Sequence, residues 1–541
     1  MLFKNRGKVF LCLFLSTLSF ATAPKDISFF DDKPRSVAKD FYIYEYLKSK
    51  QCTSKEAWAL LGQTSRMNLK LFHEFAKKLD DTGIKKASDC MSMETPKLLK
   101  TDRDCIAIGL SPYEATKLDK KQLKTLATLL EPYNEATALH VLSSIDIYQA
   151  MIHGDNDDFF ETFNKVGAGY RKEYFDKDIP PEKLNTLAKD TRINQTIQLL
   201  ITDNKTLHVN KSFLKINANE KTLTHQSLFF LGLNALKFDE KSLAIQFFEK
   251  AYKKAYRRFD KDKVAFWQYL VTKNTKYKQD VQESFDFNIY TILMEQEKPK
   301  IMIAKAYEKH PFFNEKDPFA WTKLLHTLKD KTPEQLEALA QVYLYGSSLP
   351  HFSYLMEKAS GHKDHYFPLP YKEFLKGYDN QRVALILALA RQESRFVPSA
   401  ISTSYALGTM QFMPFLAKAI AKEKGFVDFE LEDMFNPETA YMFANIHLNY
   451  LEKYLYHPLF IAYAYNGGIG FTKRLLQKGV FKKGEYEPYM SMELVPYEES
   501  RKYGKKVLAN YIMYMKILGE KVSVKNLFDD LTNPAKTDAF R

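Results

Sequence analysis

A single glutamate, Glu393, follows an apolar segment and has the setting that a general acid needs. The eight residues between Arg382 and Arg391 are all apolar and rich in Ala and Leu, a pattern typical of a helix buried on most of its faces. A carboxyl at the C-terminal end of such a helix has apolar neighbours and lies near the negative end of the helix dipole, and both effects raise its pKa. A raised pKa permits proton donation near neutral pH. Arg391 would oppose this effect if it paired with Glu393, and the sequence leaves that pairing open.

Taken alone, Glu393 is more often explained as a solvated residue at a helix end, so its interpretation depends on the blocks that accompany it. These blocks, in order, are Glu393-Ser394-Arg395-Phe396, Ser402, Gly408-Thr409-Met410-Gln411-Phe412-Met413-Pro414, Ala464-Tyr465-Asn466-Gly467-Gly468 and residues 490–511, MSMELVPYEESRKYGKKVLANY. The set resembles the lysozyme-like domain of lytic transglycosylases, whose pattern is ES-x-F, then G-x-MQ-x-MP, then AYN-x-G. The last block resembles the E-L-I-P-x-x-E-T-R-x-Y-V segment of the soluble, Slt-type members.

The resemblance implies a role for each matched residue. Glu393 is the catalytic acid, and the implied substrate-binding residues are Ser402, Met410, Gln411, Met413, Tyr465, Asn466 and Glu493. Ser402 would orient the acid, the Met-Gln segment would line the glycan cleft, and Tyr465 with Asn466 would lie beside the acid. Glu493 would hold the stem peptide.

Structural explanations exist for most of these residues. Met410 and Met413 are, by themselves, more often core residues, and Tyr465 is core or surface. Asn466-Gly467-Gly468 is by itself a turn. For Glu493 a helix cap is an equal account, so only the joint occurrence of the blocks favours function.

The resemblance implies a reaction that needs one carboxyl group, where most glycosidases use two. Glu393 would protonate the oxygen between N-acetylmuramic acid and N-acetylglucosamine, the 2-acetamido group would stabilise C1, and Glu393 would then take the proton of the C6 hydroxyl as a 1,6-anhydro ring closes. The acidic residues between the blocks, in KGFVDFELEDMFNPETA, are explained as a charged loop that enters a helix at Asn436-Pro437.

One loop departs from the family pattern S-x-x-G-A-x-G before L-MQ. In Ser402-Thr403-Ser404-Tyr405-Ala406-Leu407-Gly408-Thr409, Tyr405 replaces a glycine and Thr409 replaces a leucine. Because tyrosine does not easily adopt a positive φ, we expect this loop to follow a different path.

The N-terminal half indicates a stack of helices. Helical spacing of apolar residues or good helix formers occurs at Phe41–Lys48, Lys55–Leu61, Ser65–Leu79, Lys121–Leu130, Ala136–Met151, Leu184–Ile201, Ser227–Leu236, Glu240–Phe259 and Val264–Val271. The pair at 227–259, with a small residue at Gly232, resembles a tetratricopeptide-like hairpin. Stacked pairs form a solenoid, and the family resemblance implies a superhelix that closes toward a ring.

We therefore predict an all-α protein with an α-superhelical domain at 24–298, a small helical linker domain at 299–364 and a lysozyme-like domain at 365–541. The linker is expected to hold four short helices, Ile301–Lys309, Ala320–Leu328, Pro333–Tyr345 and Phe352–Lys358. Thr332-Pro333-Glu334-Gln335 is a strong helix start, with Thr332 as cap.

The first 23 residues predict an export signal. Lys4, Arg6 and Lys8 precede an apolar run, and Ala21-Thr22-Ala23 supplies small residues for cleavage. No later stretch reaches the roughly 18 apolar residues of a membrane span. We expect a periplasmic protein without an integral membrane segment.

Composition limits the partners and cofactors. The formal net charge is +13, and +10 without the three basic residues of the signal, which suits an acidic polymer such as peptidoglycan, although a basic surface also serves plain solubility. Export makes nucleic acid an improbable partner. We expect a monomer, and no metal or nucleotide-binding motif and no cofactor is indicated.

Three cysteines, Cys52, Cys90 and Cys105, follow the signal. One disulfide and one free thiol are therefore expected in an oxidising compartment, and Cys90–Cys105 closes the shortest loop.

Three functions follow as hypotheses. The first is a peptidoglycan lytic transglycosylase, the second a lysozyme-type hydrolase on the same fold, and the third a non-catalytic wall-binding scaffold. An intact Glu393 in its full context disfavours the third.

Overall fold

The computed structural model describes residues 25–203, 205–295, 301–302 and 310–541, and the expected export signal at 1–23 lies outside these residues. Within them, the paired strands are β1 (Ile301–Met302) and β2 (His365–Tyr366), which run parallel with Ile301 opposite His365. Each of these strands has two residues, and the other elements of the described chain are helices, so the predicted all-α class is confirmed.

The N-terminal half is a run of short helices that follow one another in space. They are α1 (Val37–Lys48), α2 (Ser54–Leu61), α3 (Leu69–Lys78), α4 (Thr82–Ser92), α5 (Thr95–Leu98), α6 (Arg103–Gly109), α7 (Pro112–Ala115), α8 (Lys120–Leu129), α9 (Ala136–Ser143), α10 (Ile147–His153), α11 (Asn156–Phe163), α12 (Ala168–Tyr170), α13 (Pro181–Ala188), α14 (Ile193–Asp203), α15 (Leu207–Ser212), α16 (His225–Lys237), α17 (Lys241–Lys254), α18 (Arg258–Thr272), α19 (Thr275–Gln282) and α20 (Ile289–Leu293).

Most predicted helices of this half are confirmed, and two of the long ones are divided. The helix expected at Ala136–Met151 is two, α9 and α10, because Asp146 caps α10 by accepting a hydrogen bond from the Gln149 N–H. The helix expected at Leu184–Ile201 is likewise α13 and α14. Glu240–Phe259 ends earlier than predicted, at Lys254.

The predicted hairpin is α16 and α17, which pack closely at Gly232. A Cβ atom at Gly232 would lie 2.4 Å from the Phe248 ring, so only glycine permits this approach. The aromatic rings of Phe229, Phe248 and Trp267 then join the hairpin to α18.

The second half begins with a small group of helices, α21 (Pro318–Thr327), α22 (Pro333–Gln341) and α23 (Leu349–Ala359). Most of their buried apolar residues form a hydrophobic cluster separate from the large one, which runs from Phe30 to Leu531 and includes Phe319 of α21. The capping box at Thr332 and Gln335 is confirmed. The helix expected at Ile301–Lys309 is wrong at its start, since Ile301 and Met302 form β1, and 303–309 lie outside the described residues.

The remaining helices are α24 (Asn380–Glu393), α25 (Pro414–Lys424), α26 (Pro437–Leu451), α27 (Pro458–Gly467), α28 (Ile469–Gln477), α29 (Tyr489–Glu493), α30 (Glu498–Ile517), α31 (Val524–Asp530) and α32 (Pro534–Thr537). As predicted, Asn436 caps α26 and Pro437 is its first residue. The three-domain boundaries stay a prediction.

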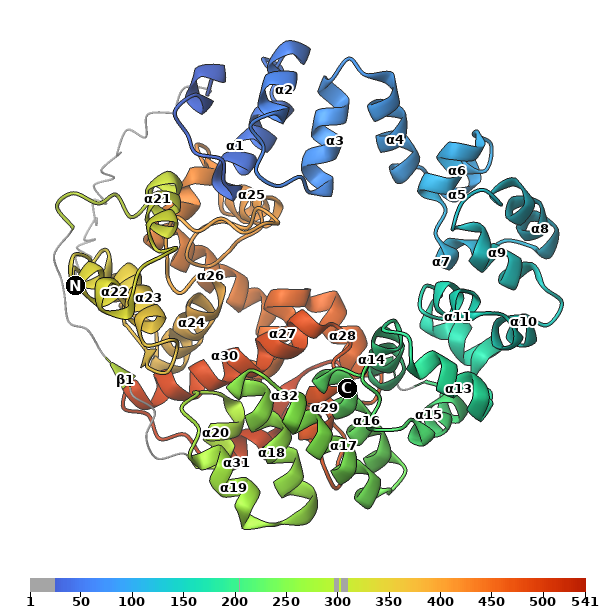
Figure 1. Ribbon diagram of the computed structural model, residues 1–541. Coiled ribbons are helices and arrows are strands. Elements are labelled where there is room, and N and C mark those ends of the chain that lie inside the picture. Colours follow the sequence, from blue (N-terminus) through green and yellow to red (C-terminus); the bar gives the residue numbers. More distant parts are fainter. Residues whose placement is uncertain (1–24, 204, 296–300, 303–309) are drawn as a thin grey trace, which may run out of the picture.

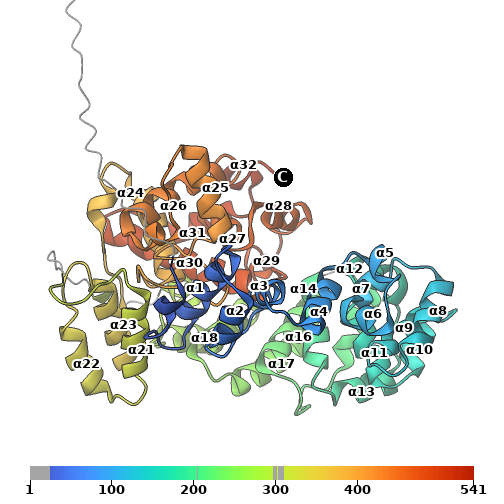
Figure 2. The same cartoon turned by 90° about the horizontal axis from the view of Figure 1, so that it is seen from above.

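The helices are arranged in a ring (Figure 1), and α24–α26 rise above the layer that the superhelix forms (Figure 2). Aromatic side chains close the ring where α1 meets α21, because Tyr42 stacks on Phe319 with ring centroids 5.6 Å apart and Phe29 packs against both. At the other end of the superhelix α20 contacts α30. The sequence left open whether the solenoid closes, and these contacts close it.

The disulfide Cys90–Cys105 joins α4 to α6, and Cys52 is a buried free thiol. This is the pairing with the shortest loop, as predicted.

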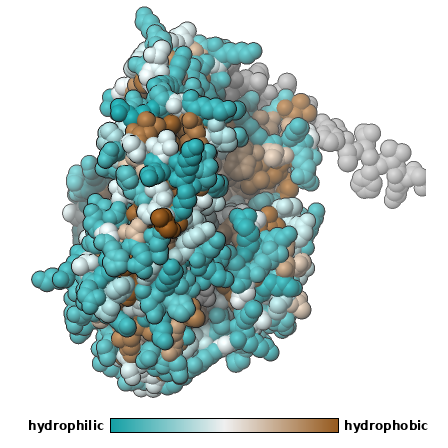
Figure 3. All heavy atoms as spheres, turned by 90° about the vertical axis from the view of Figure 1, so that its right-hand side faces the viewer, coloured by the Kyte–Doolittle hydropathy of each residue, from teal (hydrophilic) through white to brown (hydrophobic). Residues whose placement is uncertain are grey.

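The outer side of the ring near α8 and α10 is mostly hydrophilic, with apolar side chains in separate patches (Figure 3). Across the described ranges, no helix is long and apolar enough to cross a bilayer. The same ranges hold no group of three or more His, Cys, Asp or Glu side chains placed to bind a metal ion.

Candidate active site

Helix α24 carries Glu393 as its last residue and is buried as predicted. Residues 384–390 are each at most 4% exposed. Asp379 caps the N-terminus by accepting from the Arg382 N–H. The helix ends sharply because Arg395 and Phe396 both have positive φ, 53° and 67°, a conformation that costs energy for side chains with a Cβ. Such strain is often found at functional sites.

The carboxyl of Glu393 accepts a hydrogen bond from one tyrosine. The Tyr503 hydroxyl of α30 donates a hydrogen bond of 2.6 Å to Glu393 Oε1. Withdrawal from water raises the pKa of Glu393 to about 8, the Tyr503 hydrogen bond lowers it, and the charge of Glu499 raises it. With its pKa raised to about 8, Glu393 holds a proton at neutral pH. The residue is also partly exposed, so a ligand can reach it, and both properties fit a general acid.

Arg391, which could have opposed the raised pKa by pairing with Glu393, forms an ion pair with Glu357 instead. Arg391 Nη2 lies 3.0 Å from Glu357 Oε1 of α23, and Arg391 also donates to the Tyr366 carbonyl and to Asn510. Its guanidinium therefore points away from Glu393 and does not oppose the effect of burial.

The loop after α24 holds Ser402 and Gln411 within its own hydrogen bonds. Ser402 Oγ accepts from the Ala406 N–H at 2.9 Å, and Gln411 Nε2 donates to the carbonyls of Ala400 and Gly408. Neither side chain hydrogen-bonds Glu393. The loop is attached to the acid's helix by Ser394 Oγ, which donates to the Thr409 carbonyl.

Tyr405 does adopt a positive φ, 67°, so the steric reason for expecting a different path of this loop does not hold. Its buried ring packs against Phe41 and Tyr44 of α1, with centroids 5.9 and 5.2 Å away. Asn68 and Lys70 donate to the carbonyls of Thr403 and Ser404. Packing against the superhelix thus offsets the strain, and the backbone keeps the turn that a glycine would make.

The two methionines differ. Met410 is fully buried, so its side chain packs in the core, while its carbonyl accepts a hydrogen bond of 2.9 Å from Tyr465. Met413 is partly exposed at the N-cap of α25. Of the pair, only Met413 has side-chain surface for a ligand.

Tyr465 and Asn466 lie at the end of α27. Tyr465 is close enough for the charge of Glu393 to act on it, and Asn466 bonds residues of α30, the helix that carries Tyr503. Burial raises the pKa of Tyr465, and the charge of Glu393 adds to that effect. Asn466 Nδ2 donates to Glu499 at 3.0 Å and its Oδ1 accepts from Ser500. The structure therefore brings Glu393, Tyr465 and Asn466 into one cluster.

Glu493 lies outside that cluster. It is 3% exposed, pairs with Lys505 at 2.6 Å and accepts from the Tyr290 hydroxyl of α20. Here it is neither a helix cap nor a surface group for a peptide, and it joins α29 to α20 and α30.

Sequence reasoning did not single out Tyr503 and Glu499, which contact or influence the acid. Both lie in the segment that resembles E-L-I-P-x-x-E-T-R-x-Y-V, at its second glutamate and its tyrosine. The family pattern therefore pointed to both residues. Their position one helical turn apart on α30 gained meaning only because α30 packs on α24, which carries Glu393.

Comparison with known proteins finds a family model that matches the part of the chain that carries Glu393. Residues 375–487 match the family model described as "Transglycosylase SLT domain". The soluble lytic murein transglycosylases of Escherichia coli K12 and Salmonella typhimurium are each 29% identical over 165 residues, which are 30% of this chain and 25% of theirs. The matched part thus spans a quarter of the length of these relatives.

Among solved structures, the 70 kDa soluble lytic transglycosylase of Escherichia coli aligns with 95% of this chain and 85% of its own, at 15% identity and a TM-score of 0.49. The helix that ends at Glu393, the loop that follows it and the Tyr465–Asn466 pair all fall inside the matched family model. Residues 375–487 of this chain are therefore similar to the transglycosylase SLT domain.

Proposed function

We propose that the protein is a periplasmic peptidoglycan lytic transglycosylase that cleaves the bond between N-acetylmuramic acid and N-acetylglucosamine without water. One observation carries the proposal, namely a partly exposed Glu393 whose pKa burial raises to about 8 and which has no ion-pair partner among the described residues, within the part of the chain that matches the SLT domain. The named activity of the relatives supports the choice of substrate.

In the proposed reaction, protonated Glu393 gives its proton to the glycosidic oxygen as the bond from that oxygen to C1 breaks. The acetamido carbonyl of the muramoyl residue stabilises C1. The Tyr503 hydroxyl, which donates to Glu393 Oε1, stabilises the new carboxylate. That carboxylate then takes the proton of the C6 hydroxyl while the C6 oxygen bonds to C1 and forms the 1,6-anhydro ring.

The contacts of the predicted binding residues support a role in binding substrate for some of them only. The predicted residues are Ser402, Met410, Gln411, Met413, Tyr465, Asn466 and Glu493. Tyr465 and Asn466 lie with the acid, and Met413 has exposed surface. The contacts of Ser402 and Gln411 favour a role in shaping the loop. Those of Met410 and Glu493 favour structural roles.

A hydrolase of the lysozyme type is the second candidate, because Glu499 supplies a second carboxylate near the acid. Two carboxyl groups suffice to activate water. The two functions differ in the group that attacks C1, and therefore in their products.

Mass spectrometry of digested sacculi tests both candidates. We expect muropeptides with 1,6-anhydro ends, whereas reducing ends would identify a hydrolase. Glu393→Gln should abolish digestion and leave sacculus binding intact, and Glu438→Gln, an exposed residue of α26, serves as the control. Full digestion by Glu393→Gln would overturn the proposal.

A further inference from the structure

One buried carboxylate outside the matched SLT domain contacts both arginines that flank Glu393 in the sequence. Glu357 of α23 is 2% exposed. Its Oε1 accepts from Arg391 Nη2 and from the Tyr366 N–H, each at 3.0 Å, and its Oε2 forms an ion pair with Arg395. Glu357 thus pairs with both Arg391, two residues before the acid, and Arg395, two residues after it.

The two arginines depend on Glu357 to different degrees. Arg391 also bonds Asn510 and the Tyr366 carbonyl and lies 4.0 Å from the centre of the Phe367 ring. Arg395 is 39% exposed at its side chain, and among the described residues its ion pair is with Glu357. Without Glu357, Arg391 would keep neutral partners and Arg395 would be free to turn.

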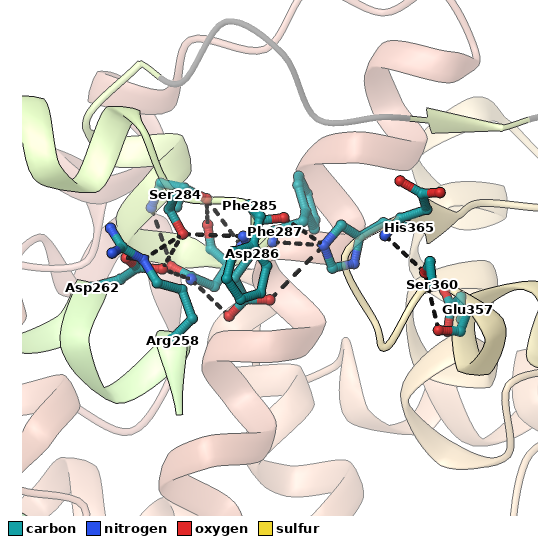
Figure 4. A network of polar contacts seen from close by, with 12 residues as sticks. Arg258, Asp262, Ser284, Phe285, Asp286, Phe287, Glu357, Ser360 and His365 are labelled. Atoms are coloured by element: carbon teal, nitrogen blue, oxygen red, sulfur yellow. Dashed lines mark hydrogen bonds and ion pairs between the residues drawn. The ribbon is translucent and has the colours of Figure 1, made fainter. Parts of the chain in front are cut away.

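Helix α23 is itself fixed to the superhelix close to Glu357. Ser360 Oγ donates to the Glu357 carbonyl and accepts from the Asp364 N–H. The next residue, His365, lies with its Nε2 3.1 Å from both the Phe287 nitrogen and the Phe285 oxygen, as Figure 4 shows. The end of α23 that carries Glu357 is therefore held by Ser360, by the segment at Asp364 and His365, and through His365 by residues 285–287 of the superhelix.

We infer that Glu357 is a positioning residue for the reaction at Glu393, which holds both flanking guanidinium groups away from the acid so that it stays uncharged until it meets substrate. The inference rests on the proposed function. The titratable groups that act on Glu393 are Tyr503 and Glu499 of α30 and Tyr465 of α27, and neither arginine is among them.

Removal of Glu357 should move the pH dependence of the reaction. A free Arg395 that approaches the carboxyl within about 4–6 Å favours the charged form and lowers its pKa by about one unit or more. Parent activity should fall as the pH rises through about 8, where Glu393 loses its proton. In Glu357→Gln this basic limb should lie at least about one pH unit lower.

The experiment measures sacculus digestion from pH 5 to pH 10 for the parent, Glu357→Gln, Glu357→Asp and the double variant Glu357→Gln/Arg395→Ala. Glu357→Asp keeps the charge and should retain the parent limb, and the double variant should regain it because the freed cation is absent. Glu452→Gln is a matched control, since it breaks an ion pair with Arg382 at the other end of α24, and its limb should not move.

If Glu357→Gln does not fold, Glu357→Gln/Arg391→Met replaces it, because it removes the buried unpaired charge and still frees Arg395. A basic limb that stays at the parent position in the folded variant, or that the removal of Arg395 does not restore, would overturn the inference. A parent that releases no anhydro product would instead count against the proposed function, so the two failures are distinguishable.

Discussion

At the scale of residues, the setting of one carboxyl group determines the chemistry. Burial raises the pKa of Glu393, and the Tyr503 hydroxyl partly offsets that effect. A group that is an acid in one step and a base in the next needs a pKa between the two extremes. The opposed influences of burial and of Tyr503 supply that balance.

Tyr503→Phe should therefore raise the pKa of Glu393 further and move the basic limb of activity to higher pH. A hydrogen bond to a charged group is worth about 1.5–3 kcal/mol, so we expect a shift of about one unit and a loss of about tenfold in kcat from the less stable carboxylate. The pH profile of digestion measures both.

Tyr463→Phe is the control for that prediction. Its hydroxyl is buried on α27 without a hydrogen-bond partner in the described chain. An equal shift in the control, or a limb that moves to lower pH in Tyr503→Phe, would contradict the assigned hydrogen bond.

At the scale of elements, the loop between α24 and α25 is shaped by contacts on both of its sides. Gly408 has φ 76°, and a Cβ there would lie 1.9 Å from the Met434 carbonyl oxygen. Tyr405 has a similar φ, but its ring fills a space against α1. Superhelical packing thus maintains a backbone conformation that glycine provides in the family pattern.

Substitution of Tyr405 separates these two contributions. Tyr405→Ala removes the ring and keeps the strain, and it should lower the free energy of unfolding by about 3–5 kcal/mol. Tyr405→Gly also relieves the positive φ and should cost about 1 kcal/mol less than the alanine variant. Urea unfolding of both variants measures the difference, and equal losses would mean that the backbone at Tyr405 is unstrained.

At the scale of the whole molecule, aromatic stacking between α1 and α21 joins the first helices of the ring to the helices that precede the SLT domain. The contact shares the closure of the ring with Tyr405, which packs on α1, and with Asn68 and Lys70, which donate to the loop between α24 and α25. Loss of this contact would also loosen α1, on which Tyr405 packs.

Phe319→Ala should loosen the ring where α1 meets α21. We expect a larger radius of gyration in small-angle X-ray scattering and faster amide exchange in α1. The control is Phe312→Ala, which alters a side chain that is 95% exposed. An unchanged radius and unchanged exchange in Phe319→Ala would show that other contacts close the ring.

The sequence by itself determined the features that depend on near neighbours. The buried helix that ends at Glu393, the caps at Thr332 and Asn436, and most helices of the superhelix follow from patterns within a few residues. It misjudged the interior of long apolar stretches such as 136–151, because a local cap at Asp146 divides them.

Only the tertiary structure decided which side chains meet. Arg391 pairs with Glu357, 34 residues away, and Tyr503 reaches Glu393 across 110 residues. Glu493 is drawn into a buried pair by Lys505 and Tyr290, and the strain at Tyr405 is offset by rings of α1. Such contacts depend on how whole helices pack, and packing is a property of surfaces assembled from distant segments, which no local pattern encodes.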